Sequence, residues 1–393
     1  MNMNMKCRIA SHKPWWLQNA LVGLACALLI AALPGLADEH GNQGRYVQTN
    51  LVSDLPGVAQ IQDTNLVNAW GMSHSGTSPF WVSDNGTGKA TLYSVTNDAS
   101  GAQIVTRLGL VVTIPGEGSV TGQAFNGGLG FNGDLFLFVS EDGTISGWRG
   151  ALGTTAEVLT NRPTASYKGA TLATNRNGHV LLAANFAEAT VDVYDTNAAL
   201  IAQYSDSRAP QGYAPFNVQN IHGFIFVTFA KVNPTTGDDV AGAGNGLIDV
   251  LDLRTGHFHR FATGADAGGR LSEINSPWGV TLAPRSFGGH GNQLLVGNFG
   301  SGTIMAFNAE GKFRGLLEDE TGAPIAIEGL WALAFGNGAS AGSTRTLFFT
   351  AGPNDEGDGL FGSLSPVPKQ GHGGHSDADE NDNEDDDDGD NHQ

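Results

Sequence analysis

The stretch SPWGVTLAP at residues 276–284 partly repeats two other stretches that lie far from it in the chain. Its Trp-Gly pair, followed by an apolar residue, also stands in NAWGMSHSG at 68–76, and a looser version, GLWALAFG, lies at 329–336. Similar sequence motifs that recur far apart in a chain are typical of folds that are built from repeated units. The phrase therefore predicts a repeat architecture.

A second pattern recurs six times: a small residue, Thr or Leu, an apolar residue, two variable residues, and an apolar or aromatic residue. Each copy follows a short apolar run that ends in Gly, Asn or Asp, which is typical of a buried strand. The copies are 46 to 57 residues apart, close to the roughly 40–50 residues of a propeller blade. We therefore expect an all-β chain folded as a six-bladed β-propeller. The copies lie at 90–95, 143–148, 189–194, 246–251, 302–307 and 359–364.

The two ends of the repeat region predict how the ring closes. The last unit ends near Ser365 with only three recognisable strands, whereas the strand-like RYVQTNLVSD at 45–54 stands alone before the first unit. We expect this N-terminal strand to complete the last blade.

The repeated phrase is expected to begin the innermost strand of a blade. Gly71 and Gly279 then fall where strands crowd the central axis and a Cβ atom would collide with a neighbour. Trp70, Trp278 and Trp331 are expected to pack between neighbouring blades, and the alternative is an aromatic platform for a ligand.

The first residues predict export. Lys6, Arg8 and Lys13 precede an apolar run at 20–33, and small residues suit cleavage after Ala37. The run has 14 residues, fewer than the roughly 20 that span a bilayer, so we expect no transmembrane helix in the mature chain. Both cysteines of the chain lie in this segment, so the mature protein would hold neither a disulfide nor a thiolate. The expected location is the periplasm or the outside of a bacterium.

The chain is strongly acidic. It has 20 Lys and Arg against 39 Asp and Glu, a net charge of −19, and residues 371–393 alone hold ten of the acids. Such a charge repels phosphate backbones, so we expect no nucleic-acid partner. The expected parts are, in order, a signal peptide (1–37), a linker (38–44), the propeller (45–366) and a disordered acidic tail rich in His and Asp (367–393).

Several stretches resemble an uncharacterised bacterial family of exported six-bladed propellers related to the NHL-repeat class. They are TNLVSDLPGVAQIQDTNLVNAWGMS (49–73), SPWGVTLAP and LLVGNFGSGTIMAF (294–307). The resemblance implies the fold and export, and it implies no reaction. The acidic tail departs from the hydrophobic sorting segment that ends some members of that family.

No nucleophile elbow, phosphate loop, zinc helix or dinucleotide fingerprint occurs in its required context, so the catalytic residues, if any, are unknown. Oxygen-bearing side chains do follow the second strand of several predicted blades, where they could converge on the mouth of the central channel. This pattern is similar to that of calcium-dependent lactonase propellers, because Ca²⁺ takes six to eight oxygen ligands. The alternative is that they are ordinary turn residues. The candidates are Asp84, Asn85, Glu141, Asp142, Asn185 and Asn298.

Other polar features carry weaker signals. The insertion at 233–246 is expected to be an exposed flexible loop, either a solvated one or one that reaches over a face of the ring and shapes a binding site. His222 is expected to be an interior histidine. His257 and His259 share one face of an outer strand, but two histidines are too few for a zinc site.

Three functions therefore stay open. The first is an exported monomeric binding or scaffold protein for a protein, a glycan or a small molecule. The second is a calcium-dependent hydrolase or lactonase at the channel mouth. The third is an envelope protein that binds cations through its acidic tail.

Overall fold

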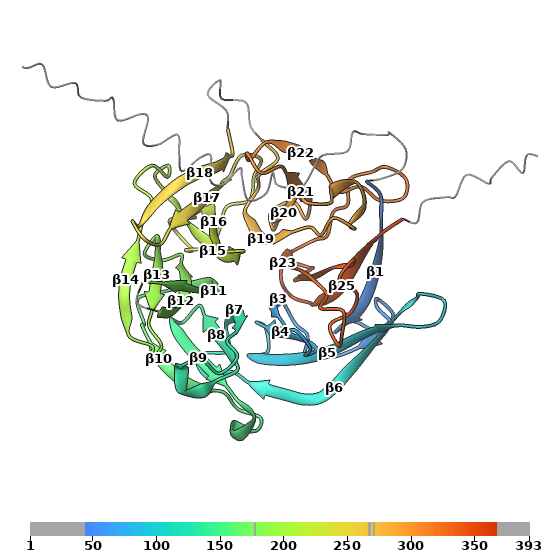
Figure 1. Cartoon of the computed structure of the whole chain (residues 1–393), viewed down its shortest axis with the longest axis horizontal. Helices are drawn as coiled ribbons and strands as arrows, with labels where there is room; N and C mark the ends of the chain where they lie inside the picture. Colours follow the sequence, from blue (N-terminus) through green and yellow to red (C-terminus); the bar gives the residue numbers. More distant parts are fainter. Residues whose placement is uncertain (1–43, 177, 266–268, 270–271, 368–393) are drawn as a thin grey trace, which may run out of the picture.

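The computed structural model describes residues 44–176, 178–265, 269 and 272–367. Its strands form six sheets arranged around one axis, and the chain passes from blade to blade around the ring (Figure 1). The predicted six-bladed β-propeller is therefore confirmed.

Each blade is an antiparallel meander whose first strand lies innermost, and in the last blade a short outermost strand adds a parallel pair. Blade one holds β3 (Ala69–Ser73), β4 (Phe80–Asp84), β5 (Lys89–Asn97) and β6 (Gln103–Thr113). Blade two holds β7 (Val120–Phe125), β8 (Phe136–Ser140), β9 (Thr144–Trp148) and β10 (Glu157–Asn161). Blade three holds β11 (Tyr167–Asn175), β12 (Gly178–Asn185), β13 (Thr190–Tyr194) and β14 (Leu200–Tyr204).

The second half of the ring repeats this plan. Blade four holds β15 (Tyr213–Ile221), β16 (Phe224–Lys231), β17 (Gly246–Asp252) and β18 (His257–Thr263). Blade five holds β19 (Pro277–Leu282), β20 (Leu294–Asn298), β21 (Ile304–Phe307) and β22 (Phe313–Leu316). Blade six holds β23 (Leu330–Phe335), β24 (Leu347–Ala351), β25 (Leu360–Pro366), β1 (Tyr46–Ser53) and β2 (Ile61–Gln62). Among the described residues, three short 3₁₀ helices lie in connections, at Phe131–Gly133, Gly150–Leu152 and Gly288–His290.

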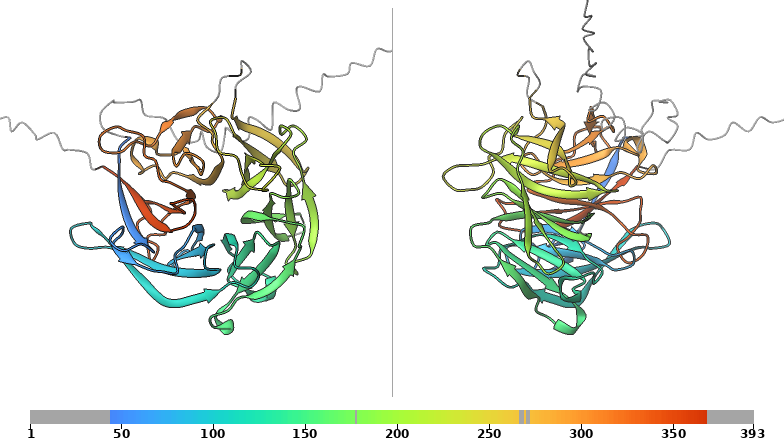
Figure 2. Two further views of the ribbon diagram at one scale, coloured as in Figure 1. Left: turned by 180° about the vertical axis from the view of Figure 1, so that it is seen from behind. Right: turned by 60° about the vertical axis from the view of Figure 1, so that its left-hand side comes forward.

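The N-terminal strand closes the ring, as predicted. Strand β1 pairs antiparallel with β25, from Tyr46 opposite Pro366 to Ser53 opposite Leu360, and the register shifts between Asn50 and Val52. Both views of the ring show the blue first strand beside the red last strand (Figures 1 and 2). The Tyr46 hydroxyl also donates to the carbonyl of Phe287 at 2.9 Å, and the two rings stack at 4.5 Å, which ties β1 to blade five.

The apolar core is divided among the blade interfaces. Between blades three and four, for example, Leu182 and Val193 pack with Val227 and Leu251, and all four are buried. Burying each such side chain contributes roughly 1.5–3 kcal/mol, so the stacked sheets hold the ring together without a disulfide.

The axis is as crowded as the sequence predicts. A Cβ atom on Gly71 would lie 2.4 Å from the carbonyl oxygen of Thr121, and one on Gly279 would lie 2.5 Å from that of Trp331. Glycine at these positions therefore lets the innermost strands of adjacent blades approach each other.

The remaining predicted parts fall almost wholly outside the described residues. This applies to the signal peptide (1–37), to the linker (38–44) except Gly44, and to the acidic tail (367–393) except Val367. Within the described part of the chain, no helix has the length and apolar character to cross a bilayer.

Candidate functional site

Aromatic side chains fill the middle of the ring. Trp70 and Trp331 stack with ring centroids 3.7 Å apart, and Trp278 meets Trp331 edge-on at 5.9 Å. Phe216 of blade four reaches Trp331 of blade six across the axis, at 5.8 Å. The three tryptophans do meet across blades, but at the axis and buried against one another, so they offer no open platform. We call this cluster the aromatic plug; it comprises Trp70, Phe186, Phe216, Trp278, Phe299 and Trp331.

A left-handed residue precedes each tryptophan of the plug by two positions. Asn68, Ser276 and Gly329 have φ angles of 47°, 46° and 66°. The carbonyl of each accepts a hydrogen bond from the backbone N–H that follows the second strand of its own blade, at 2.9–3.1 Å. This shared turn directs the chain into the innermost strand and brings the end of the second strand beside it.

One hydrogen-bonded chain starts at the plug and runs over the adjacent channel mouth. The Nε1–H of Trp331 donates to Oδ1 of Asn68 at 3.0 Å. The Asn68 amide donates to Glu356 at 2.6 Å and to Oδ1 of Asn85 at 3.2 Å, and the Asn85 amide donates to Glu141 at 3.2 Å. Because an indole N–H can only donate, it fixes the direction of every bond in the chain.

Lys168 completes this series of side-chain hydrogen bonds. Its ammonium pairs with the second carboxylate oxygen of Glu141 and lies 5.4 Å from the ring centre of Trp70 and 5.9 Å from that of Phe186. The lysine is 5% exposed, so the carboxylate and the aromatic faces replace the water that its charge loses.

Two further carboxyl groups face the same mouth. Burial raises the pKa of Asp239, and Lys168 and Ser276 only partly offset it. Burial also raises the pKa of Glu356, with Asn68 and Lys168 opposing and Glu141 and Asp239 adding to the rise. The Ser276 hydroxyl is fully buried, and within the described chain it meets no partner at hydrogen-bonding distance.

The resulting surface, the acidic mouth, is defined by Asn68, Asn85, Glu141, Lys168, Asp239 and Glu356. Its three carboxyl groups come from blades two, four and six, each from the connection between the second and third strands. Three carboxylates against one ammonium leave a formal charge of −2 when all are ionised.

Of the six sequence candidates, the structure brings only Asn85 and Glu141 together. Asp84 is fully buried and accepts from Thr91 at 3.2 Å. The Asp142 carboxylate accepts from the backbone N–H groups of Glu117 and Thr144 at 2.7 and 2.9 Å, as a turn residue does.

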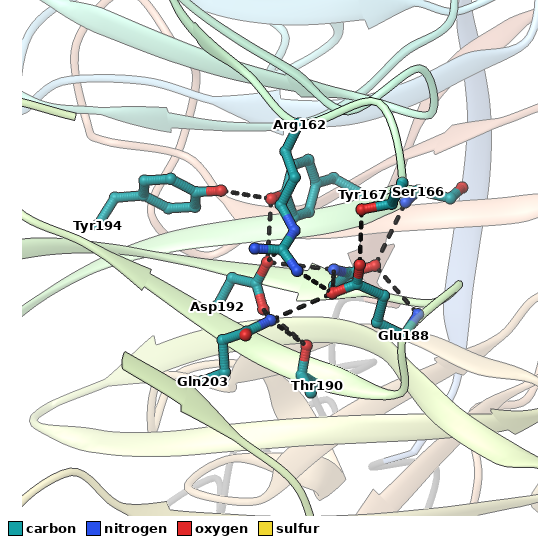
Figure 3. Close-up of polar contacts among 10 residues, drawn as sticks. Arg162, Ser166, Tyr167, Glu188, Thr190, Asp192, Tyr194 and Gln203 are labelled. Carbon is teal, nitrogen blue, oxygen red and sulfur yellow. Dashed lines mark hydrogen bonds and ion pairs between the residues drawn. The ribbon is translucent and has the colours of Figure 1, made fainter. Parts of the chain in front are cut away.

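Asn298 and Asn185 also hold local structure. The Asn298 amide donates to the carbonyl of Glu273 and to Thr303, at 2.9 and 3.0 Å. Asn185 donates to Asp192 at 3.1 Å and belongs to a polar network within blade three. In that network Tyr167 donates to Asp192 at 3.0 Å and meets the hydroxyl of Tyr194 at 2.5 Å, while Arg162 pairs with Glu188 (Figure 3).

Sequence reasoning missed four residues of the acidic mouth: Asn68, Lys168, Asp239 and Glu356. Asp239 lies in the insertion at 233–246, for which both a solvated loop and a loop that shapes a binding site stayed open. Its backbone bridges to Val232, and its carboxyl is largely buried. Lys168 stands directly before an innermost-strand glycine, as Trp70 does, and that position was the available signal.

The histidines are placed as follows. His222, expected in the interior, is instead exposed in the turn between β15 and β16. His257 and His259 are exposed on β18, as expected of alternating residues on an outer strand. Among the described residues, no three His, Cys, Asp or Glu side chains are grouped so as to hold a metal ion.

No protein-family model matches the chain. Two uncharacterised proteins of Acanthamoeba polyphaga mimivirus are similar to it. One is 28% identical over 335 residues, covering 80% of this chain and 78% of the relative, and the other is 29% identical over 334 residues, covering 80% and 84%.

These relatives correct the family assignment. The expected membership of a bacterial family of exported propellers is wrong, since the curated proteins that match are viral. The sequence stretches that carried that resemblance form three structural features of a blade. These are the left-handed turn, the innermost strand and the turn after the second strand. These features serve blade geometry, so they do not identify a lineage.

The fold is shared with solved propellers. An α-L-arabinofuranosidase from Fusarium graminearum, solved with an iminosugar inhibitor, superposes with a TM-score of 0.51 at 11% identity, covering 82% of this chain and 98% of that one. A virginiamycin B lyase from Staphylococcus aureus gives a TM-score of 0.43 at 12% identity, covering 77% and 98%. At such identities the likeness shows the fold alone.

Proposed function

We propose that this chain is a ligand-binding propeller whose acidic mouth takes a small dication. The observation that carries the proposal is the excess of carboxyl groups over ammonium groups, with Asp239 and Glu356 both raised in pKa. A raised carboxyl pKa means that the surroundings disfavour the negative charge. A bound dication would remove that penalty and neutralise the formal −2.

An alkyl diamine fits the donor set better than Ca²⁺ does. The side-chain oxygens of Asn68 and Asn85 already accept hydrogen bonds, so the two amides present N–H groups rather than oxygen ligands to the mouth. Ca²⁺ takes six to eight oxygens, whereas an ammonium group needs only carboxylate acceptors. Ca²⁺ is the alternative dication.

Titration of the purified chain with 1,4-diaminobutane or with CaCl₂, followed by thermal melting, tests the proposal. Diamine should raise the melting temperature through mass action. Glu356→Gln keeps an acceptor for Asn68 but removes one charge, so the diamine effect should shrink. The matched control is Glu310→Gln, which removes an exposed carboxylate from the β21–β22 turn and should leave the effect intact. Stabilisation by Ca²⁺ alone would select the inorganic ion, and no effect of either would refute the proposal.

A hydrolase is the second candidate, and one observation favours it. Glu356, with its raised pKa, and Glu141, held by Lys168, belong to one hydrogen-bonded chain. A protonated carboxyl and a carboxylate at one mouth can act as general acid and general base. Assays on esters and lactones, with and without Ca²⁺, and with Glu356→Gln as the inactive variant, test this candidate.

We also propose export, from the basic and apolar segment at 1–37, and a monomeric state. A scaffold role toward a protein or glycan, and cation binding by the acidic tail, are further proposals. Comparing Ca²⁺ binding of the full chain with that of a chain ending at residue 370 tests the tail. The protein recovered from a culture would reveal export by beginning after Ala37.

A further inference from the structure

The central channel contains a cavity of about 320 Å³ on the opposite side of the aromatic plug from the acidic mouth. All six innermost strands contribute to its wall, and it opens where those strands end. Small residues such as Gly71, Ala170 and Gly279 line it and leave the space free. Its volume falls in the range of roughly 300–1,000 Å³ that is typical of small-molecule sites.

The wall of this channel cavity is polar, and the titratable side chains among its described lining residues are the imidazoles of His74 and His222. Its described lining residues include four side-chain amides and no Asp, Glu, Lys or Arg. The amides are those of Gln123, Asn217, Gln219 and Asn220. The cavity therefore differs in kind from the acidic mouth, and its described lining offers a cationic ligand no carboxylate.

Three of the four amides are fixed by the protein itself. Gln123 donates to the carbonyl of Gly71 and to Ser83, both at 3.0 Å, and accepts from Ser73 at 2.9 Å. Asn217 donates to the carbonyl of Trp278 and Asn220 to that of Leu172, both at 2.8 Å. These bonds make the wall rigid before any ligand arrives, which lowers the entropic cost of binding.

Other polar groups in the wall are free. Within the described part of the chain, the Gln219 amide and the Thr281 hydroxyl make no hydrogen bond, although both are partly buried and line the cavity. The same cavity is also lined by partly exposed apolar side chains, those of Met72, Leu282 and Phe335. A ligand that suits this wall carries hydroxyl groups on one edge and C–H surface on a face.

We infer that the channel cavity is a second binding site, separate from the acidic mouth, which takes an uncharged hydroxylated ring compound of monosaccharide size. Gln219 and Thr281 bind its hydroxyl groups, and the partly exposed side chains of Met72, Leu282 and Phe335 contact its C–H face. This site does not depend on the dication proposal, because the buried plug stands between the two ends of the channel.

Saturation-transfer NMR with D-glucose, D-galactose and D-mannose tests the inference on the full chain. At least one sugar should give a transfer signal, and the double variant Gln219→Met with Thr281→Val should weaken its affinity by roughly tenfold or more. These changes remove hydrogen-bonding groups at nearly constant volume. Gln211→Met with Thr106→Val makes the same changes at exposed positions outside the cavity and should have no effect.

Each remaining outcome would overturn the inference. The first is that none of the three sugars gives a transfer signal. The second is that the double variant binds the sugar with unchanged affinity. The third is that Glu356→Gln loses the signal, which would place the sugar at the acidic mouth. If the double variant does not melt cooperatively, Thr281→Val alone is used, with the same expected direction. Diamine binding is measured separately, so either site can fail without the other.

Discussion

The indole N–H of Trp331 donates to the side-chain oxygen of Asn68 at 3.0 Å, which joins the last blade to the first at the axis of the ring. This bond connects the aromatic plug to the acidic mouth. It orients the Asn68 amide toward Glu356 and Asn85, so the packing at the centre of the fold sets the donor pattern of the candidate site.

The first prediction concerns Asn68. Asn68→Gly keeps the left-handed backbone but removes the side-chain bonds, and should lower the free energy of unfolding by about 1–3 kcal/mol. Asn68→Ala loses the same bonds and adds left-handed strain of about 1–2 kcal/mol. Urea unfolding of both variants measures the two effects, and equal stability of the two would contradict the role given to the positive φ.

The second prediction concerns the crowded axis. Gly71→Ala places a methyl group against the backbone of Thr121 and should cost about 1–3 kcal/mol of stability or more. Gly109→Ala on β6 is the matched control, since a Cβ there meets no atom within 4 Å. That control should be neutral or slightly stabilising by thermal melting.

Much of the fold was predictable from the sequence because blade geometry is local. The Trp-Gly phrase, the apolar strands and the lone N-terminal strand each reflect constraints within one blade or between neighbours. The acidic mouth was harder to predict, since Glu141, Asp239 and Glu356 come from three blades. The predicted second-strand ends supply Asn85 and Glu141 of the acidic mouth, but they also include Asn185 and Asn298, which serve their own turns. Asp239 and Glu356 lie in longer loops that reach the mouth. The spacing of residues in the sequence does not indicate in which direction such a loop runs.

The third prediction concerns pH. Burial raises the pKa of Asp249 to about 6, and Arg260 only partly offsets this rise. The native state therefore holds the Asp249 proton more tightly than the unfolded chain does, so this group's contribution to stability falls as pH rises from about 4 through 6. The loss amounts to about 3 kcal/mol. Urea unfolding measured between about pH 4 and 6 tests this. Asp249→Asn should remove the fall in the free energy of unfolding, whereas Asp355→Asn, at an exposed position, should retain it.

The fourth prediction concerns Lys168. Lys168→Met keeps the aliphatic stem over Trp70 but removes the positive charge beside Glu141, so the acidic mouth becomes more negative. The affinity for 1,4-diaminobutane should rise, by roughly tenfold if the change resembles one pKa unit of interaction. Calorimetric titration measures the change. Lys312→Met, at an exposed position on blade five, should leave the affinity unaltered; weaker diamine binding in Lys168→Met would argue that the lysine belongs to the ligand's contacts.

Proton release on binding tests the central claim most directly. Titration of the chain with 1,4-diaminobutane at mildly acidic pH, in two buffers of different ionisation enthalpy, reports the protons exchanged per ligand bound. A dication at the acidic mouth should lower the pKa of Asp239 and Glu356, so protons should be released, and Glu356→Gln should release fewer. Binding without proton release, or the same release in Glu356→Gln, would contradict the placement of the ligand among these carboxyl groups.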